Sequence, residues 1–241
     1  FQANALADAE GAVADALRRV PDHVPAQVLQ ARLLATRGDI AAAQALASQL
    51  VKRVPDDASV QALQGDLLMA KGQVEPALAA WRASLKANPS QPQVYTAVMT
   101  ALIGKQDAAG AEAQWAEMKK ALPRHPQTMF FEALLASNRG DYLKTRELTQ
   151  LLLRGAPENS RLLLLAGEAE MKLNSPAQAE ALFSKAVQLA PKLAPARRLL
   201  AQSQLQSGQH AKALATLAPL LEGKPADAEA LAMAGQAQMM S

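Results

Sequence analysis

The 241-residue chain contains no cysteine, and its aromatic side chains amount to two Trp, two Tyr and four Phe. Without cysteine, these residues cannot form a disulfide, a thiolate nucleophile or a cysteine-based zinc site. Half of the residues are nevertheless hydrophobic, so the core must be built from small and aliphatic side chains. Alanine is the strongest helix former and fills only small spaces. The composition therefore favours an all-α protein of closely packed helices.

Concentrated charge and long apolar runs are also missing. The formal net charge is +3, and runs of like charge stop at pairs such as Arg18-Arg19 and Lys119-Lys120. A nucleic-acid surface needs clustered cations with aromatic side chains for base stacking, so we predict no nucleic-acid partner. No apolar stretch approaches the roughly 20 residues needed to cross a bilayer. We therefore predict no membrane span within these residues.

Catalytic and metal-binding motifs are absent as well. The sequence has no G-x-S-x-G elbow, phosphate loop, dinucleotide fingerprint or H-E-x-x-H pattern. Its three histidines, His23, His125 and His210, have no acidic cluster at ligand spacing. Glu168 and Glu170 are two residues apart, and such residues do not face each other on a helix. We predict a non-enzymatic chain without metal or cofactor.

What the sequence does have is a proline that returns every 34 residues. Seven of the fourteen prolines lie on this spacing: Pro21, Pro55, Pro89, Pro123, Pro157, Pro191 and Pro225. A second series follows seventeen residues after each proline and is mostly glycine: Gly38, Gly72, Gln106, Gly140, Asn174 and Gly208. A fixed period of this length is typical of repeat architectures.

The proline series divides the chain into units with two helices each. Residues 1–23 form the second helix of an incomplete repeat, and residues 228–241 the first helix of another. Between them lie six units: 24–57, 58–91, 92–125, 126–159, 160–193 and 194–227. Glycine suits the turn between the helices because a left-handed residue after a helix costs it little. Proline suits the end of the second helix because it cannot continue it.

Spacing within the units predicts how the helices pack and where they begin. Small residues recur at the eighth and twentieth positions of each unit, while large ones such as Trp81 and Phe183 stand at the twenty-fourth. Small residues at both places allow the two helices to approach closely. Helix caps are predicted at Asp39, Asp107 and Asp141, each directly before a second helix. Before the second helix of the fifth unit, a capping box is predicted, with Ser175 as the cap, Pro176 in the first turn and Gln178 as the partner.

On these positions the sequence resembles the tetratricopeptide repeat, the 34-residue helix-turn-helix unit of α-solenoids. The resemblance implies a right-handed α-solenoid of about 14 antiparallel helices. Some positions depart from the family pattern: Gln27 and Gln61 at the fourth position, Gln106 in place of glycine and Thr145 in place of alanine. We expect looser packing from these departures, mainly around the third and fourth units.

The resemblance also implies a concave groove, lined by the first helices, that binds a protein or peptide partner. Carried over by position, the candidate groove residues are Arg32, Asp66, Thr96, Thr100, Phe130, Arg161, Glu168, Arg198 and Gln202. The family's carboxylate clamp requires Lys and Asn, which these positions almost entirely lack. Arg161, Glu168 and Arg198 have two interpretations: a solvated face with weak ion pairs, or a mixed-charge patch for an acidic or extended partner. One of Phe130 and Phe131 is expected in the core. The other either packs in the core as well or is exposed in the groove as an apolar anchor.

A narrower resemblance concerns the second half of the chain. Three stretches are similar to the repeat lipoprotein of bacterial exosortase and exopolysaccharide systems, the PEP-CTERM type: FFEALLASNRGDYLKTRELTQLLL, LLLLAGEAEMKLNSPAQAEALFSKAV and ARRLLAQSQLQSGQHAKALATLAPLL. It implies a scaffold in the periplasm or attached to the outer membrane, with a lipid-carrying cysteine upstream. The alternatives are a regulatory region attached to an enzyme domain outside these residues and a cytosolic peptide-binding adaptor.

The two ends lack the polar outer face that terminal repeats normally need. The last helical segment retains the apolar residues Leu231, Met233, Met239 and Met240. We expect the chain to be part of a longer array and its ends to allow end-to-end self-association.

Overall fold

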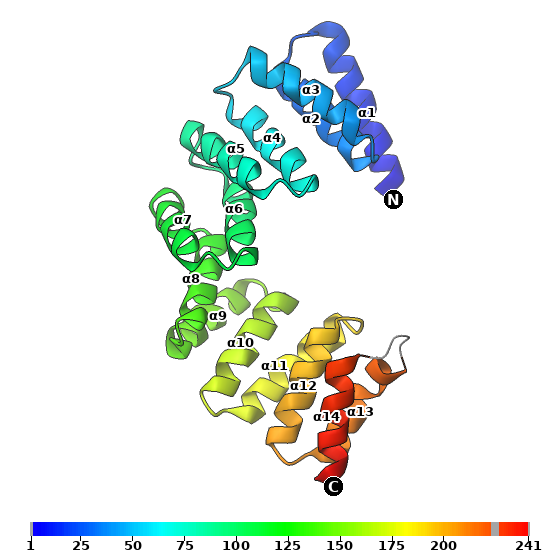
Figure 1. Cartoon of the computed structure of the whole chain (residues 1–241), viewed down its shortest axis with the longest axis vertical. Helices are drawn as coiled ribbons and strands as arrows, with labels where there is room; N and C mark the ends of the chain where they lie inside the picture. Colours follow the sequence, from blue (N-terminus) through cyan, green and yellow to red (C-terminus); the bar gives the residue numbers. More distant parts are fainter. Residues whose placement is uncertain (1, 223–226, 241) are drawn as a thin grey trace. The chain divides into compact units, whose positions relative to one another are not determined.

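The computed structural model describes residues 2–222 and 227–240, and within them the chain forms fourteen α-helices and no strand (Figure 1). The prediction of an all-α fold is confirmed. Contacts divide the chain into two compact units, Phe1–His125 and Pro126–Ser241. In both, each helix packs against its neighbours in the chain, as in an α-solenoid.

The first unit contains seven helices within its described residues. They are α1 Gln2–Arg19, α2 Val24–Thr36, α3 Ile40–Arg53, α4 Ala58–Ala70, α5 Val74–Ala87, α6 Pro92–Gly104 and α7 Ala108–Ala121. The first helices of the repeats are α2, α4 and α6, and α2 also contacts α4 directly.

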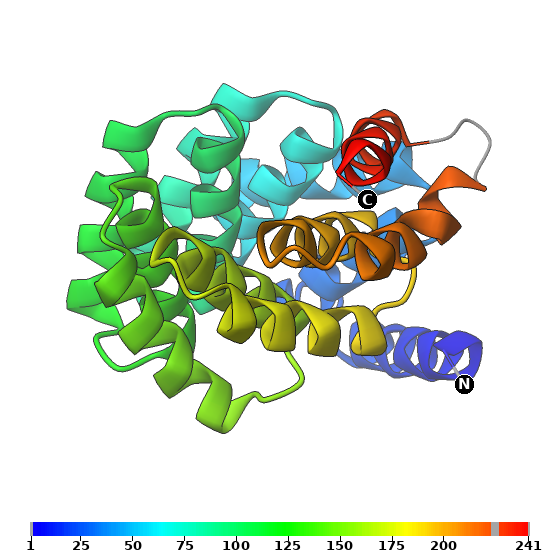
Figure 2. The same ribbon diagram turned by 90° about the horizontal axis from the view of Figure 1, so that it is seen from below.

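The second unit contains the other seven described helices. They are α8 Pro126–Asn138, α9 Tyr142–Gly155, α10 Ser160–Lys172, α11 Pro176–Leu189, α12 Ala194–Gln206, α13 His210–Leu221 and α14 Ala228–Met239. First helices contact one another along the series α8, α10, α12 and α14, and Figure 2 shows α14 beside α12 from a second direction. Across both units, first helices begin at residues 24, 58, 92, 126, 160, 194 and 228, a constant spacing of 34. Pro225 of the proline series lies outside the described residues.

The turns between paired helices have the left-handed residue that the second series predicts. Positive φ angles occur at Gly38, Gly72, Gly140 and Gly208, and also at Gln106 (59°) and Asn174 (55°). Glycine adopts this conformation without strain, whereas glutamine does not. The departure at Gln106 therefore leaves the turn in place and adds a local cost.

Three of the four predicted caps form. Asp39, Asp107 and Asp141 each accept a hydrogen bond from a backbone N–H in the first turn of the following helix. Ser175 occupies the cap position before α11 and Pro176 stands in the first turn, as predicted, but the capping box is wrong because the Ser175 side chain makes no cap hydrogen bond. Its hydroxyl donates instead to the Leu173 carbonyl (3.4 Å) and accepts from the Arg146 guanidinium (3.5 Å). The packing of α9 thus redirects the hydroxyl.

Small residues let the paired helices meet, as predicted. A Cβ atom placed on Gly65 of α4 would overlap the ring of Trp81 of α5. The same is true of Gly167 of α10 and Phe183 of α11. Both rings are almost completely buried. Each ring therefore fills the space left by the missing side chain of a glycine on the partner helix.

The departures from the family pattern have separate consequences. The amides of Gln27 and Gln61 donate to the carbonyl oxygens of Pro21 (2.8 Å) and Pro55 (2.6 Å), so they fasten the turn instead of loosening it. Thr145 is fully buried and its hydroxyl donates to the Asp141 carbonyl (2.9 Å). These three positions are thus held by hydrogen bonds, whereas α6 and α7 of the third unit pack against each other less extensively than the paired helices of the other full units, as expected.

Candidate functional site

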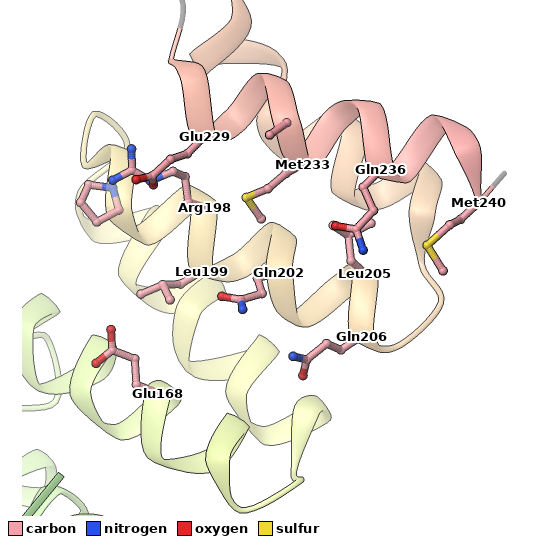
Figure 3. A pocket seen from close by; sticks show the side chains of 12 residues that line it. Glu168, Arg198, Leu199, Gln202, Leu205, Gln206, Glu229, Met233, Gln236 and Met240 are labelled. Carbon is pink, nitrogen blue, oxygen red and sulfur yellow. The ribbon is translucent and has the colours of Figure 1, made fainter. Parts of the chain in front are cut away.

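A cavity of about 850 Å³ opens on the first helices of the second unit. Twelve side chains line it, eleven from α10, α12 and α14 and the twelfth from Met240, which directly follows α14, and Figure 3 shows how they converge. The polar ones are Glu168, Arg198, Gln202, Gln206, Glu229 and Gln236, and the larger apolar ones are Leu199, Leu205, Met233 and Met240. The wall therefore alternates amides and charges with flexible apolar side chains.

The lining residues share a register in the repeat. Counted within the units that begin at residues 160, 194 and 228, all twelve stand at positions 2, 5, 6, 9, 12 or 13. These positions lie on one face of each first helix, because residues three and four apart are neighbours on a helix. Of the nine predicted groove residues, this cavity brings together Glu168, Arg198 and Gln202.

A second hollow of about 280 Å³ adjoins the first. The two share Glu168, Leu199, Gln202 and Gln206, and the second extends to Ser137 at the end of α8. Together they form a groove across the first helices α8, α10, α12 and α14. We refer to the residues lining these two hollows as the C-terminal groove.

Arg198 is bound by two carboxylates. Its Nη1 lies 2.7 Å from Asp227 Oδ2, and its Nε lies 2.9 Å from Glu229 Oε2. Asp227 also caps α14 by accepting the N–H of Ala230 at 3.0 Å. This backbone hydrogen bond, with the attraction of Arg198, lowers the pKa of the Asp227 carboxyl. The guanidinium charge is therefore neutralised within the protein.

Glu168 has a different environment. Within the described residues no hydrogen bond or ion pair to its carboxylate occurs, and only the attraction of Lys172, one turn further along α10, acts on it. Burial raises the pKa of this carboxyl, and Lys172 opposes the rise in part. The groove therefore holds a carboxylate that remains exposed to solvent and has no direct partner in the described part of the chain.

Two other predicted residues of the second unit lie outside these hollows. Arg161 is exposed in the first turn of α10 and lines neither of them. Phe130 lines a separate pocket of about 330 Å³ with residues of α9 and the start of α10. Its ring meets the buried ring of Phe131 edge to face, with centroids 5.5 Å apart. Phe131 is thus the core residue of the pair, and Phe130 is half-buried.

The four candidates of the first unit lie on α2, α4 and α6. Arg32 pairs with Asp66 across neighbouring first helices at 3.4 Å. Asp66 also accepts the indole N–H of Trp81 at 3.0 Å. Burial raises the pKa of Asp66, while the Trp81 hydrogen bond and Arg32 counteract the rise. Two threonines complete the set: Thr96 donates to the Pro92 carbonyl at 2.8 Å, and Thr100 is exposed.

Several residues that line the groove were not predicted from the sequence as groove residues. Leu205, Gln206 and Met240 stand at positions 12 and 13, which the family register already assigns to the groove face. Reading the register through to these positions identifies them. Glu229, at position 2, carries the same signal, whereas Asp227, the other carboxylate partner of Arg198, stands outside the register and depends on how α12 and α14 meet.

No group of three or more His, Asp or Glu residues that could hold a metal ion occurs in residues 2–222 and 227–240. Among the same residues, none of the helices combines the length and apolar character that a bilayer crossing requires.

Comparison with known families gives matches along most of the chain. Two tetratricopeptide repeat models match, one over residues 1–58, 28–92 and 131–194 and the other over residues 171–237. No curated protein sequence matches the chain.

Solved structures similar to the chain share its fold at low sequence identity. The chain of the APC/C hetero-tetramer Cut9–Hcn1 aligns with a TM-score of 0.82 at 14% identity over 95% of this chain and 45% of its own, so the present chain spans less than half of it. PilF of Pseudomonas aeruginosa aligns with a TM-score of 0.74 at 14% identity, over 88% of this chain and 96% of its own. YrrB, described as a repeat protein with an unusual peptide-binding site, aligns with a TM-score of 0.58 at 14% identity, over 77% and 95%.

Proposed function

Because the chain belongs to the tetratricopeptide repeat family, we propose that it is a non-enzymatic scaffold whose C-terminal groove binds an extended segment of a partner protein. One observation carries the proposal: the residues lining the 850 Å³ cavity come from first helices, apart from Met240 directly after α14, and all of them stand at six positions of the repeat. A surface repeated in this way offers equivalent contacts to successive residues of a bound chain.

The chemistry of the groove fits a peptide backbone. The side chains of Gln202, Gln206 and Gln236 each carry a donor and an acceptor, which are the groups that a peptide bond requires. Met233 lies next to Gln236 and Leu199 next to Gln202 (Figure 3), and methionine adapts its shape to different apolar partners. The groove therefore combines backbone hydrogen bonding with apolar contacts.

The proposal is tested with a random-peptide library displayed on phage and selected on the immobilised chain. We expect enriched peptides that lose binding at least tenfold in a double variant, Gln202→Arg with Gln206→Arg. The matched control introduces the same two arginines on exposed positions of second helices, Gln150→Arg with Gln188→Arg, and should bind as the wild type does. Selected peptides that bind both double variants equally would place the binding surface elsewhere.

A second candidate function, self-association end to end, is favoured by the uncovered faces of α1 and α14. A Cβ at Gly235 of α14 would meet nothing within 4 Å, whereas the equivalent Gly65 and Gly167 lie against aromatic rings. On α1, Ala9 is partly exposed, although its equivalents Ala43 and Ala77 are fully buried. An α14 of one copy and an α1 of another would complete one repeat, a head-to-tail contact.

Sedimentation velocity over a range of concentrations tests this second candidate. We expect the wild type to associate as concentration rises. The variant Leu231→Arg, which changes a leucine of α14 that is 52% exposed, should remain monomeric. Leu143→Arg on α9, where the leucine is 65% exposed, serves as the control and should associate normally. A wild type that is monomeric at all concentrations would contradict it.

The third part of the proposal is a place in the bacterial envelope, in the periplasm or attached to the outer membrane, alongside exopolysaccharide export or exosortase sorting. Its support is the resemblance of the three stretches within residues 130–221 to the PEP-CTERM-type lipoprotein, while the family models match residues 131–194 and 171–237 as tetratricopeptide repeats. A regulatory region joined to an enzyme domain and a cytosolic adaptor are the alternatives. Fractionation of the source cells with an antibody against the chain tests the location: recovery in the periplasm or outer membrane supports this part, and recovery in the cytosol contradicts it.

A further inference from the structure

The arginines predicted for the C-terminal groove suggest a positively charged site for an acidic partner, but the structure does not provide one. Arg198 is held by Asp227 at 2.7 Å and by Glu229 at 2.9 Å. To bind an acidic partner, Arg198 would have to give up one of these carboxylates. Arg161, the other arginine considered for an acidic partner, lines neither hollow. The groove therefore has no guanidinium ready to receive an anion.

Counting the charged groups gives the groove a negative balance. Its two hollows are lined by Glu168, Glu229, Arg198 and Lys172, and Asp227 stands behind Arg198. Three carboxylates thus face two cations. Asp227 and Glu229 are in direct contact with Arg198, whereas Glu168 has no contact ion pair among the described residues and is influenced only by the attraction of Lys172.

Glu168 also stands where a bound chain must pass. It is one of the four residues common to both hollows, and in Figure 3 its side chain points from α10 toward α12, where Leu199 lies. Leu199 and Gln202 give this place an apolar side and an amide side. A lysine or arginine side chain has the same two parts, an aliphatic stem and a donor-bearing head.

We propose that the C-terminal groove selects extended peptide segments with a positively charged side chain, whose head group pairs with Glu168 while its stem lies against Leu199. This inference rests on the proposed function, because it names the chemical class of the segment bound in the same groove. A charged pair of this kind forms short hydrogen bonds stronger than those between neutral groups.

Fluorescence anisotropy with three dye-labelled peptides tests the selectivity. The peptides are short, acetylated and amidated, consist of Gln, Leu and Ala, and differ only in a central lysine, norleucine or glutamate. We expect the lysine peptide to bind the wild type about tenfold more tightly than the norleucine peptide does. This difference in affinity should shrink as salt is added, because salt screens the charged pair. The glutamate peptide should bind most weakly.

Two variants at Glu168 separate charge from shape. Glu168→Gln should abolish the preference for lysine over norleucine, and Glu168→Lys should reverse it in favour of the glutamate peptide. Glu147→Gln, at an exposed position of α9, removes the same charge elsewhere and should leave the preference unchanged.

The outcomes distinguish this inference from the proposal beneath it. If none of the three peptides binds the wild type, groove binding and charge selectivity are both overturned. If all three bind equally, or if the preference for lysine survives Glu168→Gln, the selectivity is overturned and groove binding stands.

Discussion

At the scale of single residues, two tryptophans at the same repeat position have opposite surroundings. Trp81 is 3% exposed and its indole N–H donates to Asp66 at 3.0 Å. Trp115, one repeat later, has a buried indole nitrogen for which no hydrogen-bond partner exists within the described residues. A buried donor without a partner costs free energy comparable to a lost hydrogen bond. The same residue type therefore stabilises one repeat more than the next.

Replacing each tryptophan by phenylalanine should reveal this difference. Trp81→Phe loses the hydrogen bond and part of the ring, and we expect the free energy of unfolding to fall by about 2 kcal/mol. Trp115→Phe removes the unpaired donor along with some apolar contact, so its effect should be within about 0.5 kcal/mol of zero. Urea denaturation followed by circular dichroism measures both. Equal losses would mean that the indole nitrogens contribute nothing.

A capping carboxylate shows how a single side chain makes stability depend on pH. Asp57 accepts from the N–H groups of Ser59 (2.8 Å) and Val60 (3.0 Å) and from the Ser59 hydroxyl. Burial alone would raise the pKa of Asp57, but these hydrogen bonds outweigh it and lower the pKa below the usual 3.8. A carboxyl with a lower pKa in the folded state stabilises the fold above its unfolded pKa, and this stabilisation is lost as pH falls through the folded pKa.

Asp57→Ala should therefore lower the free energy of unfolding by about 1 kcal/mol at pH 7. Its difference from the wild type should shrink as the pH drops below 3.8. The neighbouring exposed Asp56→Ala is the control, with little effect at either pH. Urea titrations at neutral and acidic pH supply the comparison, and a difference that stays constant would argue against the cap.

At the scale of elements, the helix pairs depend on the left-handed residue between them. Gly72 adopts this conformation with a φ of 73°, and Gln106 occupies the equivalent place in the next repeat with a φ of 59°. A side chain at positive φ is strained, whereas glycine is not. The α6–α7 turn is thus formed against the preference of its own residue.

Exchanging these residues gives predictions of opposite sign. Gln106→Gly should raise the free energy of unfolding by about 0.5 to 1 kcal/mol, and Gly72→Gln should lower it by about 1 kcal/mol. Thermal and urea denaturation would detect both. Loss of stability in Gln106→Gly would show that the glutamine side chain contributes contacts that exceed the strain.

The sequence predicts well those structural features that are determined by residues close together in the chain. The turn at Gly38 and the cap at Asp39 follow from conformational preferences within a few residues, and the groove face follows from the 34-residue register. The pairing of Arg198 with Asp227 could not be predicted, because the partners are 29 residues apart and meet only when α12 packs against α14. The hydroxyl of Ser175 likewise depends on Arg146 of a neighbouring helix.

At the scale of the whole molecule, the two units carry different spectroscopic probes. Both tryptophans lie in the first unit, whereas helices of both units contribute to circular dichroism. In a solenoid each repeat interacts with its neighbours only, so stability is distributed along the chain. Unfolding of one unit can therefore be followed separately from unfolding of the whole.

A cavity in the second unit should separate these signals. Phe183 is fully buried against Gly167, and Phe183→Ala should cost about 3 to 5 kcal/mol of local stability. We expect the circular dichroism transition to begin at lower urea while the tryptophan fluorescence transition keeps its midpoint. Gln188→Ala, on the exposed surface of the same helix, should shift neither. Parallel shifts of both signals in Phe183→Ala would indicate a single cooperative transition.

The constant spacing of the first helices has a consequence for how such a gene can change. The turns before α2, α4 and α12 are fastened alike, by a side chain at the fourth repeat position that donates to the carbonyl of Pro21, Pro55 or Pro191. Unequal recombination between two repeats would remove or duplicate one whole unit and preserve the phase of every helix and turn. Since the groove face recurs with the same period, such an event would shorten or lengthen the groove by one first helix. Inheritance could thus adjust the length of the bound segment in single steps without redesigning the fold.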